Sequence, residues 1–230
     1  MGVLRTFRDL FRRDNWSQAT TARVGEMLDL CSAMFDYVNG VVVEGRPDSD
    51  PRSKVFRRDK RVNDLEREVR RSVVTHLVLE SDSYDIPSAL IFMNVVKDAE
   101  RIGDYIKNLH DVARELMPEN PDRELYRQEL GDDAAAIGIL LPRTTRAFTA
   151  SEEDEARAVI EECRTRSRGV EERIARLARS DLPVADAVSL VLILRFYKRI
   201  FSHLSNIATT VVMPVDAMDF FDENEAGDID

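Results

Sequence analysis

The stretch KDAERIGDYIKNL, at residues 97–109, decides the fold of this chain and contains its most informative polar residues. Glu100, Asp104 and Asn108 follow one another in steps of four residues. On an α-helix this spacing places the three side chains along one face. The stretch therefore predicts a helix with an oxygen-rich face.

A degraded copy of the same stretch lies in the second half of the chain. The sequence RFYKRIFSHLSNI at residues 195–207 keeps the pattern, but Lys198 and Ser202 replace Glu100 and Asp104. An internal repeat determines the architecture before any other pattern is considered. We therefore interpret the chain as two copies of one helical unit, with the carboxylates lost from the second copy.

The composition supports a helical globular protein. Of the 230 residues, 43% are hydrophobic and 33% are charged, and there are only 9 glycines and 8 prolines. These values are typical of long, solvated helices around a real core. No apolar run approaches the roughly 18 residues of a membrane span, and no signal peptide is visible, so a cytoplasmic protein is expected. The net charge of −10 argues against nucleic acid as a partner, because phosphates repel an acidic surface.

Apolar residues recur at helical spacing in six segments, which are separated by loops rich in Gly, Pro and Asp. The sequence predicts an all-α fold of two tandem three-helix bundles with antiparallel, up-and-down helices. Gly131 and Pro142 predict a break or kink in the helix at 121–150. The predicted units are a basic amphipathic N-terminal segment (1–16), the first three-helix repeat (17–118), a degenerate second repeat (121–213) and an acidic disordered tail (214–230).

Two segments suggest contacts beyond the bundle. Residues 4–13, LRTFRDLFRR, carry four arginines against one aspartate on an amphipathic pattern. They either pack on the bundle or contact an acidic partner or the inner face of a membrane. The last predicted helix, 184–213, is apolar on nearly all sides, so part of it must face the other repeat or another subunit. A homodimer is therefore expected.

The polar face of 97–109 has two interpretations. The second predicted helix offers Asp59 and Asn63, again four residues apart, so two neighbouring helices would supply four or more hard oxygen ligands to a metal ion. Alternatively, the face is solvated and Arg101 neutralises its carboxylates in an ordinary ion pair. The surrounding Val, Ile and Ala residues favour a bound cation, because a bare carboxylate is costly in an apolar setting.

RRDKRVNDLE (57–66) followed by KDAERIGDYIKNL resembles the paired signature of the PhoU family, the cytoplasmic negative regulators of phosphate uptake. The family pattern D-x-x-V-N matches Asp59, Val62 and Asn63, and its E-R-I-G-D matches residues 100–104. The resemblance covers about residues 17–213. It implies paired three-helix bundles with metal ions on the carboxylate faces, working with a phosphate transporter and its sensor kinase. Because KRIFS (198–202) replaces E-R-I-G-D, metal binding is expected in the first repeat only.

The expected function is that of a regulatory adaptor in phosphate homeostasis, which binds a transporter or sensor-kinase partner and is not an enzyme. The implied cofactor is a divalent or trivalent ion: Fe, Mn, Mg, Ca or Zn. The alternatives are a metal-dependent enzyme on a helical bundle and a purely structural bundle that accompanies a membrane protein. The predicted metal ligands are Asp59, Asn63, Glu100, Asp104 and Asn108.

Overall fold

A computed structural model describes residues 15–79 and 86–215, and 87% of these are helical with no strand among them. The all-α prediction is therefore confirmed. A π-helical turn, η1 (Arg52–Phe56), leads directly into the second long helix. The α-helices of the described residues are α2 (Asn15–Val42), α3 (Arg57–Leu79), α4 (Ile86–Glu115), α5 (Arg123–Ala150), α6 (Glu153–Leu177) and α7 (Val184–Val212).

The predicted break in the fourth helix is wrong, because α5 runs uninterrupted from Arg123 to Ala150 with Pro142 inside it. The alternative, a kink, stays a prediction. Proline removes one helical hydrogen bond and crowds the carbonyl of the residue four positions earlier. That residue is Gly138, and a Cβ placed on it would meet nothing within 4 Å. The exposed proline ring therefore lies on an open side, while burial of Ile137, Leu140 and Leu141 holds the helix to the core.

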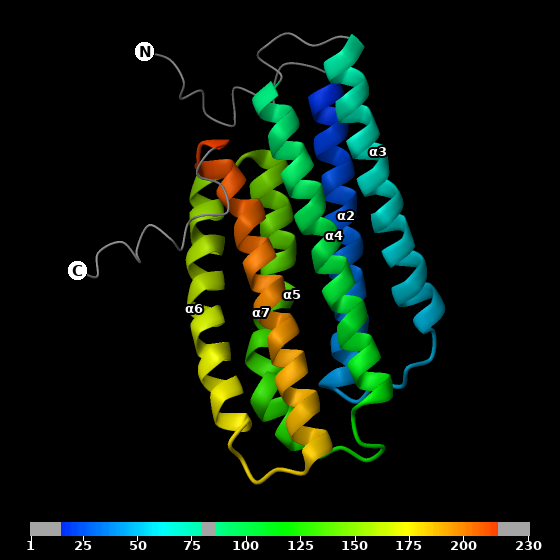
Figure 1. Cartoon of the computed structure of the whole chain (residues 1–230), viewed down its shortest axis with the longest axis vertical. Coiled ribbons are helices and arrows are strands. Elements are labelled where there is room, and N and C mark those ends of the chain that lie inside the picture. The colour runs from blue at the N-terminus through cyan, green and yellow to red at the C-terminus, as the bar shows by residue number, and fades with distance from the viewer. Residues whose placement is uncertain (1–14, 80–85, 216–230) are drawn as a thin grey trace, which may run out of the picture.

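The helices run up and down in two groups of three, α2 to α4 and α5 to α7 (Figure 1). Short connections make consecutive helices antiparallel neighbours. The two groups meet where α4 packs on α7 and α2 packs on α5. One continuous cluster of buried apolar side chains extends through all six helices. The two halves therefore share a core.

The last helix lies at the centre of this arrangement. Helix α7 contacts α4, α5 and α6, and Leu190, Leu194 and Tyr197 are fully buried. Packing between the two halves thus covers most of the apolar sides that suggested a second subunit, although Val188 stays 43% exposed. The homodimer remains a prediction.

Two of the predicted segments fall largely outside the described residues: the basic stretch 4–13, and the acidic tail beyond Val215. Within the described residues, no helix is both long and apolar enough to cross a membrane.

Candidate functional site

The structure brings the carboxylates of α3 and α4 together around a lysine. Nζ of Lys107 donates a hydrogen bond to Oδ2 of Asp59 at 3.1 Å and another to Oδ1 of Asp104 at 2.9 Å. The Asp59 side chain is 13% exposed and that of Asp104 28% exposed. Burial lowers the pKa of Lys107, but the hydrogen bonds to Asp104 and Asp59 outweigh it and raise the pKa above its ordinary value. Lys107 is therefore a charged bridge between the two helices.

Glu100 extends the cluster one turn toward the start of α4. Burial raises the pKa of Glu100 to about 7, with the negative charges of Asp104 and Glu66 adding to the effect. Arg101 opposes this shift, since its guanidinium lies 3.7 Å from Glu100 and 3.6 Å from Asp104. Arg101 thus neutralises part of the charge on this face, as the alternative interpretation of the sequence proposed. Arg101 is nevertheless more distant from the carboxylates than Lys107 and is itself 53% exposed.

The two predicted amide ligands do not join the carboxylates. Asn63 and Asn108 are half-buried, and within the described residues no hydrogen bond connects either to Asp59, Glu100 or Asp104. The described side chains also include no group of three or more His, Cys, Asp and Glu residues arranged to hold a metal ion. The chemistry of the donors still fits a hard cation, because carboxylates from two helices converge on one positive charge. Metal binding stays a prediction.

A thiol that the sequence analysis did not connect with this face lies directly behind it. Cys31 of α2 is fully buried and donates to the backbone oxygen of Ala99 at 3.5 Å. Burial raises the pKa of the Cys31 thiol, and the charges of Asp59 and Glu100 raise it further. The thiol is therefore neutral and unreactive. Gly103 faces the same spot, since a Cβ there would lie 3.6 Å from Val62 and 3.7 Å from Cys31.

The second half of the chain has ion pairs in place of the carboxylate face. Lys198 pairs with Glu171 of α6, and Ser202 donates to the backbone oxygen of Lys198. Asp133 of α5 is only 1% exposed and pairs with Arg173 of α6. These ion pairs therefore join both α5 and α7 to α6.

Two histidine–carboxylate pairs were not predicted. Nε2 of the buried His110 lies 3.0 Å from Oδ2 of Asp48, whose other oxygen accepts a hydrogen bond from Tyr37. Nδ1 of His203 lies 2.9 Å from Oδ1 of the buried Asp98. The partners in each pair are far apart in sequence and lie on different elements. No spacing rule would have found them.

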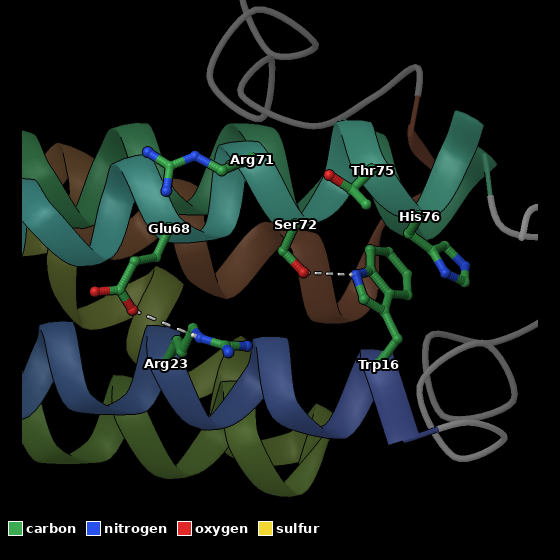
Figure 2. A pocket seen from close by; sticks show the side chains of 7 residues that line it. All are labelled: Trp16, Arg23, Glu68, Arg71, Ser72, Thr75 and His76. Atoms are coloured by element: carbon green, nitrogen blue, oxygen red, sulfur yellow. Dashed lines mark hydrogen bonds and ion pairs between the residues drawn. The ribbon is translucent and has the colours of Figure 1, made fainter. Parts of the chain in front are cut away.

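A pocket of about 400 Å³ lies between the start of α2 and the end of α3 (Figure 2). Nε1 of Trp16 donates to Oγ of Ser72 at 3.0 Å, and the Trp16 ring stacks on His76 with centroids 4.0 Å apart. Farther along the same two helices, Arg23 of α2 lies 3.8 Å from Glu68 of α3. The aromatic and polar side chains that line the pocket thus largely contact one another. We interpret the pocket as the junction that holds the start of α2 on α3.

The fold and the carboxylate cluster define a class of protein, an all-helical bundle of two three-helix units with an acidic face in the first. The family model of the PhoU domain matches residues 24–113, which contain α3, nearly all of α4 and the whole cluster. The resemblance to the PhoU family that was drawn from the sequence is therefore confirmed over these residues.

The chain as a whole is also similar to a solved PhoU structure. The crystal structure of PhoU from Pseudomonas aeruginosa matches it with a TM-score of 0.71 and 18% sequence identity, covering 86% of this chain and 95% of that chain. At this level of identity the likeness establishes the fold. No curated protein matches the sequence.

Proposed function

We propose that this chain is a non-enzymatic regulator of phosphate uptake that acts by binding a phosphate transporter or its sensor kinase at the inner face of the membrane. The observation that carries the proposal is the PhoU domain at residues 24–113. The PhoU fold over most of the chain supports it. The two histidine–carboxylate pairs described above also favour binding over turnover, because each is largely buried and joins one element to another.

A surface suited to a protein partner lies where α3 ends and α4 begins. Val74 and Val78 are one turn apart on α3 and are 58% and 75% exposed. Ile86 and Leu90 are one turn apart on α4 and are 49% and 52% exposed. The end of α3 and the start of α4, which carry these residues, lie at the same end of the bundle (Figure 1). Several exposed apolar side chains at one place favour protein association. We call these four residues the apolar tip.

The proposed metal site consists of Asp59, Glu100 and Asp104, with Asn63 and Asn108 on neighbouring turns of the same helices. A hard divalent or trivalent cation bound there would neutralise the carboxylates and fasten α3 to α4. We propose a structural role for the ion, because the site lies between two helices of one repeat. We also propose that the protein forms a homodimer.

Binding to purified partners tests the adaptor function. The immobilised full chain is exposed to the ATPase subunit of a phosphate transporter and, separately, to the cytoplasmic part of its sensor kinase, both from the same cell. We expect saturable binding to at least one of them. Val78→Glu combined with Leu90→Glu should weaken binding at least about tenfold, because a charge at the centre of an apolar contact must be desolvated. Val184→Glu is the control, since Val184 is 79% exposed at the other end of the bundle.

Phosphate uptake by cells with and without the chain provides the second readout. Loss of the chain should leave uptake unrestrained when phosphate is plentiful, and the apolar-tip variant should fail to restore control. Failure to bind either partner together with unchanged uptake would contradict the adaptor function. Metal-dependent turnover of a phosphate ester would instead support the enzyme alternative.

A further inference from the structure

Lys107 occupies the place in the first repeat where a cation joining α3 to α4 would lie. Its ammonium nitrogen is within 3.1 Å of one carboxylate on each helix, Asp59 and Asp104. We propose that Lys107 is an internal competitor that must leave this position before a metal ion binds. This inference rests on the proposed metal site and adds a residue that controls its occupancy.

Electrostatic repulsion prevents the Lys107 ammonium and a metal ion from occupying the site at the same time. A divalent ion held by Asp59 and Asp104 would lie within a few ångströms of the Lys107 ammonium, where two positive charges repel strongly in a partly buried setting. Both carboxylates and the lysine are less than one-third exposed, so water screens the repulsion only in part. The metal ion and the ammonium therefore exclude each other from the same pair of oxygens.

The lysine is also able to leave without disturbing the helices. Its charge sits on a flexible four-carbon stem, and the side chain is 26% exposed, so the ammonium reaches water by rotation of its own bonds. Arg101, the other cation of the cluster, lies at least 3.6 Å from the carboxylates and is already largely in solvent. Competition for the site is therefore assigned to Lys107.

The test compares Mn²⁺ binding to four forms of the full-length, chelator-treated protein. These are the wild type, Lys107→Met, Lys60→Met, and Lys107→Met with Asp59→Asn and Asp104→Asn. Methionine keeps the length of the lysine stem and removes its charge. Lys60 is the matched control, because it is an exposed lysine directly after Asp59 on α3. Calorimetric titration with MnCl₂ measures affinity, and melting curves with and without MnCl₂ measure stabilisation.

Lys107→Met should bind Mn²⁺ at least about tenfold more tightly than the wild type, since the ion no longer displaces a charge-assisted hydrogen-bonded cation. Lys60→Met should match the wild type. The triple variant should lose binding. Without metal, Lys107→Met should melt below the wild type, because Asp59 and Asp104 then repel each other without the cation that bridges them.

The competing outcomes separate this inference from the metal site itself. Equal Mn²⁺ affinities for the wild type and Lys107→Met, with binding lost in the triple variant, would overturn the role of Lys107 and leave the site in place. Equal tightening by Lys60→Met would also overturn it, because the effect would be one of overall charge. Absence of binding and of a melting shift in all forms would overturn the metal site and the inference together.

Discussion

Nδ1 of His203 on α7 lies 2.9 Å from Oδ1 of Asp98 on α4, and this contact joins the two halves of the chain. Tyr105 stacks on His203 and also on Phe196, with ring centroids 5.6 and 5.9 Å apart. The offset that relates the two repeats matches Asp98 to Phe196 and Tyr105 to His203. The junction is therefore nearly self-complementary, as in a twofold symmetric dimer, although it lies within one chain.

Replacing His203 should destabilise the whole bundle. Asp98 is 1% exposed, and its Oδ2 already lacks a hydrogen-bond partner among the described residues. His203→Ala leaves a buried carboxylate with Lys97, whose ammonium lies 3.7 Å away, as its remaining cationic partner among the described residues. We expect the free energy of unfolding to fall by about 3 kcal/mol, as measured by urea denaturation. In a double-mutant cycle with Asp98→Asn, a coupling energy near zero would show that the pair contributes nothing.

Glu100 should make stability depend on pH. Its pKa in the folded protein is raised to about 7, above the ordinary value of 4.5, by burial and by Asp104 and Glu66. Between these two pH values the folded state binds more protons than the unfolded state. The free energy of unfolding of the metal-free protein should therefore fall as pH rises from about 4.5 to about 7. Glu100→Gln should flatten this slope, whereas Glu115→Gln, at an exposed position at the end of α4, should leave it unchanged.

Gly103→Ala should stabilise the protein. An added Cβ at Gly103 would make ordinary van der Waals contacts at 3.6 Å with Val62 and 3.7 Å with Cys31. Alanine also has less conformational entropy than glycine in the unfolded chain and a higher helix propensity. Together these effects add about 0.5–1 kcal/mol to the free energy of unfolding. The melting temperature should rise accordingly. Gly103→Leu should lower it, because the longer side chain must displace Val62 or Cys31.

Arg173→Met should be costly at neutral pH and less so in acid. Asp133 is 1% exposed, and burial raises its pKa while Arg173 and Arg166 oppose the rise. Removing Arg173 leaves the buried charge with Arg166 at 3.7 Å, so we expect a loss of about 3 kcal/mol at pH 7 in urea denaturation.

The loss from Arg173→Met should shrink as pH falls and Asp133 takes up a proton, since a neutral acid needs no cationic partner. Arg176→Met is the matched control. Arg176 pairs with Glu129 at 2.5 Å but is itself 58% exposed, so its removal should cost about 1 kcal/mol or less. A larger loss for Arg176 than for Arg173 would contradict this ranking.

The predicted helices were largely correct because helical periodicity is a local property. The helix predicted at 121–150 is α5 at Arg123–Ala150, and the helix predicted at 184–213 is α7 at Val184–Val212. The error at Pro142 has a tertiary cause. A proline breaks an isolated helix, but here the buried side chains of the neighbouring turn hold α5 against the core.

The sequence by itself determined the all-helical class, the two repeats, the PhoU resemblance and the alignment of Glu100 with Asp104, because all of these depend on spacing along one helix. Only the tertiary structure decided that Lys107 bridges Asp59 and Asp104, and that His203 meets Asp98. These partners lie on different helices. Which side chains meet there depends on how each helix is rotated and shifted against its neighbours, and that is set by packing of the shared core.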